Sequence, residues 1–125
     1  IRRGDYLHNQ GNHAIQSLEY YEEALKHFDE NINVMIFSDD LIWCKEQDLF
    51  KPDRFLISET NNNVYDLCLM TLCDHFIIAN SSFSWWGAWL STNRDKKVIS
   101  PKNWFGPNNQ NLNTEDLYCP DWIII

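Results

Sequence analysis

Three short polar clusters in this sequence carry side chains that could bind a phosphorylated ligand. The first is Arg2-Arg3-Gly4-Asp5, in which a guanidinium group can hold phosphate through two parallel hydrogen bonds. Neighbouring residues at a strand end point to opposite faces, so we expect one arginine to face the ligand and the other to pair with a carboxylate. Gly4 permits a sharp turn or a close approach of the ligand to the backbone.

Two other interpretations of this first cluster stay open. It is equally typical of an arginine–aspartate pair on the protein surface, with little functional consequence. Arg3-Gly4-Asp5 also spells an adhesion tripeptide, but that function needs an exposed and flexible loop. The end of a strand inside a layered core is the wrong setting for it.

The second cluster, Ser38-Asp39-Asp40, follows a short apolar run. A carboxylate at such a strand end can accept hydrogen bonds from ribose hydroxyls or from the N–H groups of guanine. A divalent metal site is an alternative, although these aspartates are adjacent rather than separated by one residue as in a DxD triplet. Asp is also a favoured N-cap residue for a following helix, and the capping and ligand roles can coexist.

The third cluster, Asn80-Ser81-Ser82-Phe83-Ser84, lies between an apolar run and a predicted helix. The free N–H groups at a helix N-terminus hold phosphate well, and serine hydroxyls add further donors. The competing interpretation is an ordinary serine cap. The triplet that begins at Asn80 also fits the glycosylation pattern, but a strand-to-helix corner is a poor acceptor.

Other residues that could bind a ligand or react are assigned to the core. Trp85, Trp86 and Trp89 follow the serine cluster on the same predicted helix, and aromatic residues usually dominate buried area. The four cysteines lack the spacing of a zinc site or of a disulfide framework. We therefore expect small buried thiols in a reducing compartment at these four positions: Cys44, Cys68, Cys73 and Cys119.

The pattern of apolar residues predicts the elements that must position the three clusters. Helices are expected at residues 17–31, 41–50, 64–73 and 82–91, and strands at residues 33–38, 54–58, 75–79 and 97–100. The tail, residues 108–125, is expected to be coil that packs back through Trp122. Apolar strands that alternate with helices favour an α/β fold with a Rossmann-like parallel sheet. Ligands bind beyond the carboxyl ends of such strands, where all three clusters fall.

Composition sets further bounds. The 125 residues are enough for one domain and too few for two ordinary ones. The net charge of −8 makes a nucleic-acid partner implausible. No apolar run approaches the roughly 18 residues that span a bilayer. The chain begins at Ile1 rather than at an initiator Met, so we expect a fragment of a longer protein and draw nothing from the absence of a signal peptide.

The sequence resembles glycosyltransferase family 11, the α-1,2-fucosyltransferases, in four stretches. They are IRRGDY at 1–6, FSDDLIWC at 37–44, ANSSFSWWGAWLS at 79–91 and VISPKNWF at 98–105. The resemblance covers the whole chain, which corresponds to the C-terminal half of such an enzyme, and is closer to bacterial members. It implies a GT-B fold in which residues 1–125 form the domain that binds the donor GDP-fucose, and the acceptor-binding half precedes it.

The implied reaction is an inverting, metal-independent transfer of fucose to the 2-hydroxyl of a terminal galactose in a glycan, with no cofactor. The catalytic residues would be Arg2, Arg3 and Asp5: one arginine would bind the β-phosphate and stabilise the departing GDP, and Asp5 would support the loop. Asp39 or Asp40 would contact guanine or ribose. The diphosphate would be lined by Ser81, Ser82, Phe83 and Ser84.

The expected location is the cytoplasm, with the inner face of a bacterial membrane and peripheral association as a further possibility. Two alternatives are kept. One is an α/β nucleotide-sugar transferase of another class that binds metal through Asp39 and Asp40. The other is a noncatalytic module that binds a partner through a tryptophan-rich surface or a mobile Arg-Gly-Asp loop, and exposed Trp85 or Trp89 would favour it.

Overall fold

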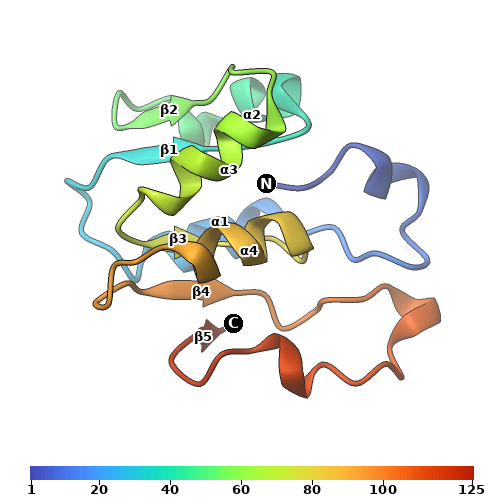
Figure 1. Ribbon diagram of the computed structural model, residues 1–125. Coiled ribbons are helices and arrows are strands. Elements are labelled where there is room, and N and C mark those ends of the chain that lie inside the picture. The colour runs from blue at the N-terminus through green and yellow to red at the C-terminus, as the bar shows by residue number, and fades with distance from the viewer.

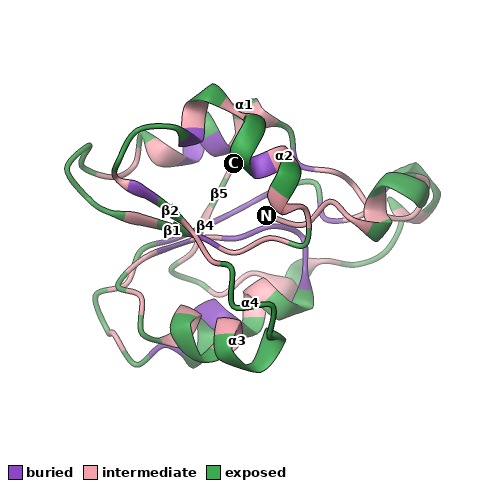
Figure 2. Ribbon diagram, turned by 90° about the horizontal axis from the view of Figure 1, so that it is seen from above, coloured by how far each residue is buried: buried purple, intermediate pink, exposed green.

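Parallel strands lie between two layers of helices in the computed structural model, which describes all 125 residues. Figure 2 shows α1 and α2 on one side of the strands and α3 and α4 on the other side. The strands point the same way, so their carboxyl ends lie at one edge of the molecule (Figure 1). The α/β architecture predicted from the sequence, with parallel strands flanked by helices, is confirmed.

The four helices form where the apolar spacing predicts them, with shorter bounds. They are α1 (Leu18–Leu25), α2 (Leu41–Glu46), α3 (Asn63–Thr71) and α4 (Ser82–Leu90). The predicted continuation of α1 to residue 31 is wrong, because residues 26–28 turn back through hydrogen bonds to carbonyls three positions earlier. Residues 48–50, predicted as the end of α2, form a separate 3₁₀ turn.

The strands are short and form two sheets instead of one. β1 (Val34–Ile36) pairs with β2 (Phe55–Ile57), and β3 (Phe76–Ile77) pairs with β4 (Val98–Ser100). No ladder joins β1 to β3. Each sheet has its own buried cluster: one centres on Tyr21, Ile36, Cys44, Phe50 and Phe55, the other on Phe76, Ile78, Ala88, Val98 and Trp104.

Helix α1 connects the two sheets. Tyr21 is buried in the cluster of the first sheet. Its neighbour Tyr20 donates a hydrogen bond of 2.7 Å to the carbonyl oxygen of Ile78, directly after β3. On the opposite face α3 and α4 pack side by side. The close packing there requires Gly87, because a Cβ at that position would lie 2.7 Å from the sulfur of Met70.

The C-terminal tail was predicted as coil, and this prediction is partly wrong. Residues 108–122 contain turns and short 3₁₀ segments, one of them at Glu115–Leu117, but the chain ends in β5 (Ile123–Ile124), which extends the second sheet beside β4. Trp122 packs against Trp85 as expected, with ring centroids 5.7 Å apart. None of the helices has the length and hydrophobicity that crossing a membrane requires.

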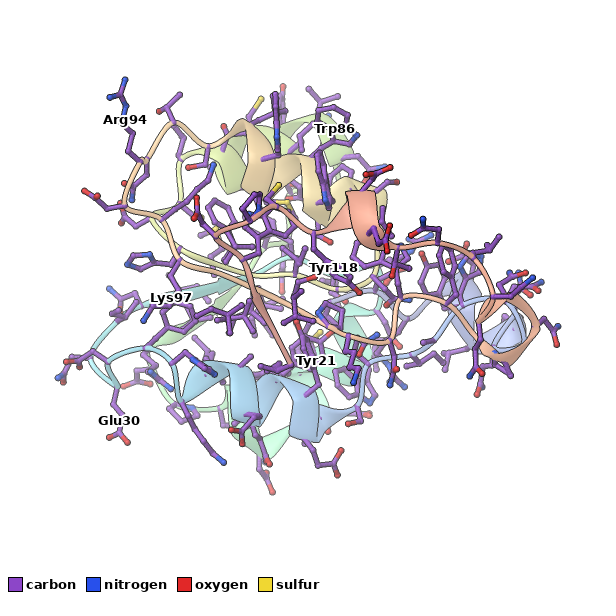
Figure 3. All side chains as sticks on the ribbon, turned by 90° about the horizontal axis from the view of Figure 1, so that it is seen from below. Tyr21, Glu30, Trp86, Arg94, Lys97 and Tyr118 are labelled. Atoms are coloured by element: carbon purple, nitrogen blue, oxygen red, sulfur yellow. The ribbon has the colours of Figure 1, made fainter.

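Two expectations about the core need correction. Of the four cysteines only Cys44 is buried; Cys68 is exposed and the other two are half-buried. Of the three tryptophans on α4, Trp85 packs into the core of the second sheet, whereas Trp86 and Trp89 are 47% and 51% exposed. Figure 3 shows Trp86 at the outer side of the layer formed by α4. A helix that packs on only one side cannot bury aromatic residues all around it.

Candidate functional site

Arg2 is held by two carboxylates. Its Nη2 lies 2.7 Å from Asp5 Oδ1, and its Nη1 lies 2.6 Å from Asp39 Oδ2. The guanidinium also lies over the ring of Tyr6, 5.1 Å from the centroid. Both terminal nitrogens of Arg2 are therefore engaged within the protein. This arginine has the role of an internal brace between the first residues of the chain and the carboxyl end of β1.

Arg3 is held mainly by stacking and keeps its hydrogen-bond donors free. Its guanidinium lies 4.0 Å from the centroid of the Trp43 ring. Its Nε is 3.5 Å from Asp40 Oδ2, is buried, and has no hydrogen-bond partner. The two terminal nitrogens have no partner either. Residues 1–3 form no strand, so the expected strand end at the arginines is wrong for this chain. The two arginines nevertheless point to different partners, and Arg3 is the one with uncommitted donors.

The two aspartates after β1 are tied to this arginine loop. Asp39 accepts hydrogen bonds from the backbone N–H of Arg3 at 2.9 Å and from Arg2. Asp40 caps α2 by accepting a bond of 3.1 Å from the N–H of Trp43. Gly4 is required beside them, because a Cβ there would lie 2.6 Å from Asp39 Oδ2.

This arrangement bears on the alternatives for the first two clusters. The capping role weighed for Asp40 is confirmed. Each aspartate has an arginine as its charged neighbour, and no group of three or more His, Cys, Asp or Glu side chains comes together in the structure. The exposed, flexible loop that an adhesion tripeptide needs is not found, because Arg3 is stacked on Trp43 and its side chain is 16% exposed.

The N-terminus of α4 keeps its first amides free of side-chain caps. Ser81 is the N-cap residue in extended conformation, but its side chain accepts no hydrogen bond from the helix. Two other helices differ in this respect, since Asp40 caps α2 and Asn62 caps α3. Ser84 Oγ donates instead to the carbonyl oxygens of Ala79 and Ser81, both at 3.0 Å. The simple capping interpretation of Ser81 is therefore wrong.

Tyr6 joins the arginine loop to the start of α4. It lies on the 3₁₀ turn η1 (Asp5–His8), and its hydroxyl donates a bond of 3.1 Å to the carbonyl oxygen of Asn80. Burial raises the pKa of Tyr6, which keeps this hydroxyl protonated and able to donate. The clusters at 2–5 and 80–84 thus lie at the same edge of the molecule, as expected from the carboxyl ends of parallel strands.

The buried side chain of Asn80 holds the start of α4 in place against two neighbouring loops. Its side chain is buried and donates to the carbonyl oxygens of Ala14 and Trp104, each at 2.8 Å. It also accepts a bond of 3.1 Å from Gln16. A glycan cannot be attached to an amide in this position, so Asn80 is a structural residue.

The sequence interpretation missed two residues that shape the site, Tyr6 and Trp43. Both lie inside stretches that were singled out for their charged residues. Each adjoins a cluster at a spacing compatible with a turn or a first helical turn. The missing information was their long-range partner, which spacing along the chain does not give.

Replacing Ser82 with alanine tests whether the start of α4 binds phosphate. Ser82 is exposed and its hydroxyl makes no hydrogen bond, so the melting temperature is expected to stay unchanged. If the hydroxyl donates to the second phosphate of GDP, its loss weakens GDP binding by roughly tenfold, the low end for a hydrogen bond to a charged group. Binding of GMP, which lacks that phosphate, should not change. Calorimetric titration with both nucleotides measures the difference.

Ser17→Ala is the matched control, because Ser17 is also an exposed N-cap residue whose side chain caps no helix amide. It should leave both affinities and the melting temperature unchanged. A Ser82→Ala protein that melts lower and binds both nucleotides normally would show that the hydroxyl has only a structural role.

Comparison with known proteins finds glycosyltransferases among the relatives of this chain. The chain is 39% identical to the O-antigen biosynthesis glycosyltransferase WbnK of Escherichia coli, over 94% of the chain and 42% of that protein. It is 38% identical to an alpha-1,2-colitosyltransferase of Escherichia coli, over 100% of the chain and 46% of that protein. It is 28% identical to galactoside alpha-(1,2)-fucosyltransferase 2 of Bos taurus, over 98% of the chain and 38% of that protein.

The chain thus spans less than half the length of these curated relatives. No solved structure matches it. The pattern of the family described as Glycosyl transferase family 11 matches residues 1–125, the whole chain. The fold and the relatives agree with this match. The chain belongs to glycosyl transferase family 11.

Proposed function

We propose that this chain binds the donor in an α-1,2-glycosyltransferase that moves fucose from GDP-fucose to the 2-hydroxyl of a terminal galactose. The observation that carries the proposal is that two groups with the chemistry to bind phosphate lie at one edge of the molecule. Arg3 has free guanidinium donors, the start of α4 has uncapped amides, and Tyr6 links the two segments. The acceptor would be bound by a further domain of the same enzyme.

The Arg3 guanidinium and the first backbone amides of α4 both suit the departure of GDP. As the bond to the sugar breaks, negative charge grows on the β-phosphate, and donors fixed in advance stabilise that charge without reorganising. Arg3 is held in position by Trp43, and the amides of α4 are held by the helix. An arginine and a helix N-terminus can supply what a divalent ion supplies elsewhere, so we propose a reaction without metal.

The remaining residues of the site take supporting roles in this proposal. Asp39 and Asp40 would contact guanine or ribose through lone pairs that their arginine partners leave free. Asp5 would support the loop through Arg2, which it contacts at 2.7 Å. Its side chain is 69% exposed, and we assign no catalytic base within the chain.

The relatives favour two sugars for the donor. One is named an alpha-1,2-colitosyltransferase and another is named a galactoside alpha-(1,2)-fucosyltransferase. Colitose is fucose without its 3-hydroxyl, so the same diphosphate site serves either sugar. We propose fucose, with colitose as the competing donor sugar.

Calorimetric titration of the chain with GDP, ADP and UDP tests the nucleotide. Guanine presents N–H donors to a carboxylate that adenine does not present in the same way, and a charged hydrogen bond contributes about 1.5–3 kcal/mol. GDP is therefore expected to bind roughly tenfold to a hundredfold more tightly than ADP or UDP. Addition of EDTA should leave this affinity unchanged. Equal affinities for GDP and ADP, or binding abolished by EDTA, would contradict the proposal.

A further inference from the structure

β1 uses only one of its two edges. The N–H of Val34 donates to Arg54, and Ile36 accepts from the N–H of Ser58, both at 2.8 Å, so these residues face β2. Backbone groups of successive residues in a strand alternate between the two edges. The N–H and C=O of Met35 therefore point away from β2, toward the second sheet.

β3 repeats this arrangement from the other side. Phe76 donates to Lys97 at 2.8 Å and Ile78 donates to Ile99 at 2.9 Å, so these residues face β4. Ile77 directs its backbone groups away from β4, toward the first sheet. The two sheets thus face each other with unpaired inner edges, although unpaired backbone groups inside a protein are unfavourable.

A cavity of about 600 Å³ lies between these edges, lined by residues 33–37 and 73–78 among others. We call it the strand slot. Its lining is mainly hydrophobic, with 17 hydrophobic residues of 25. The lining also includes Tyr21, whose buried hydroxyl has no hydrogen-bond partner (Figure 3). The slot therefore suits an apolar segment that also carries backbone acceptors and donors.

Ile1 already occupies the end of the strand slot. Its nitrogen donates a bond of 2.7 Å to the carbonyl oxygen of Phe37, which lies two residues beyond Met35 and so on the same edge. Figure 1 shows the N-terminus between β1 and β3, on the side to which their arrows point. Burial lowers the pKa of the Ile1 amino group, so a charged group is disfavoured there. A peptide nitrogen would donate the same bond without a charge.

We propose that the strand slot binds a sixth parallel strand. This strand consists of four or five apolar residues joined to Ile1 through a peptide bond. The length follows from the slot-lining segments at 33–37 and 73–78. The direction follows from Ile1, because polypeptide that enters through the slot and ends at Phe37 runs parallel to β1 and β3. The curated relatives are more than twice as long as the part they share with this chain.

The added strand would join the two sheets into one, in the order β2-β1-new strand-β3-β4-β5. The order of strands would then reverse at the new strand, and ligands of open α/β sheets bind at such a reversal, beyond the carboxyl ends. Arg2 and Arg3 would follow the central strand directly. The new strand would therefore place the arginines opposite the start of α4. This inference stands on the edges and the cavity, and does not depend on which donor is bound.

Amide hydrogen exchange on extended chains tests the proposal. The probe is the 125-residue chain preceded by Lys-Lys-Lys-Val-Val-Ile-Val-Val, in which the lysines maintain solubility. The matched control replaces the last five residues of the extension with Gly-Ser-Gly-Ser-Gly. Exchange at Met35 and Ile77 is expected to slow at least tenfold with the apolar extension only. If the 125-residue chain does not fold alone, cooperative unfolding restored by the apolar extension only is the equivalent result.

Met35→Pro provides a second measurement. Proline removes a backbone N–H donor that faces the slot and not β2. The unextended chain should therefore lose little stability, because proline is tolerated on an edge strand. In the apolar-extended chain the same substitution should remove most of the gained protection at Ile77. Equal protection with both extensions would overturn the proposal. Protection without any extension, in a chain that sediments as a dimer, would assign the slot to a second copy and overturn it equally.

Discussion

Replacing Arg3 with lysine is expected to weaken GDP binding by roughly tenfold to a hundredfold, which corresponds to the loss of about 1.5–3 kcal/mol of charged hydrogen bonding. Lysine keeps the charge but has neither the planar fork nor the flat surface that stacks on Trp43. Arg2→Lys should weaken binding less and lower stability more, because Arg2 already pairs with Asp5 and Asp39. Calorimetry and thermal unfolding separate the two effects.

Arg94→Lys is the control for this pair. Arg94 is exposed and projects away from the body of the molecule (Figure 3), so neither affinity nor stability should change. A larger loss of affinity for Arg2→Lys at unchanged stability would reverse the assignment. Normal GDP binding by both variants would remove the arginines from the phosphate site.

Replacing Asn80 with aspartate is expected to lower the free energy of unfolding by about 2–5 kcal/mol. The side chain donates two hydrogen bonds to the carbonyl oxygens of Ala14 and Trp104 and is only 2% exposed. Aspartate would place a buried charge against two acceptors and leave both unpaired. Urea unfolding measures the change.

Asn111→Asp is the matched control, since Asn111 is an exposed asparagine. It adds the same charge at the surface and should change stability by less than about 0.5 kcal/mol. If the two variants unfold alike, the buried amide does not hold the edge of the sheet together.

The elements that the sequence predicts best are those with a local physical cause. α3 begins where Asn62 accepts from the amides of Val64 and Tyr65, and an asparagine before an apolar run signals such a cap. β5 was missed because two isoleucines at the end of the chain form a strand only beside β4. The early end of α1 was missed for a similar reason, because its apolar spacing continues to Phe28 without a local stop signal.

The candidate site was predicted in its parts but not in its pairings. The three polar clusters do lie at the carboxyl edge of the strands, as the α/β pattern requires. The sequence left open which arginine keeps its donors free. Trp43 decides this by stacking on Arg3, and Asp39 decides it by binding Arg2. Neither contact has a fixed spacing along the chain; Arg2 and Asp39, for example, are 37 positions apart.

The sequence by itself determined the α/β class, the order of helices and strands, and the edge where charged and serine residues gather. These follow from the period of the apolar residues and from the rule that parallel strands end on one side. Only the tertiary structure decided that the strands form two sheets with unpaired inner edges, and that Asn80 is structural and Arg3 available. Edge pairing and burial depend on which segments meet in space, and the pattern of residues along the chain does not specify those meetings.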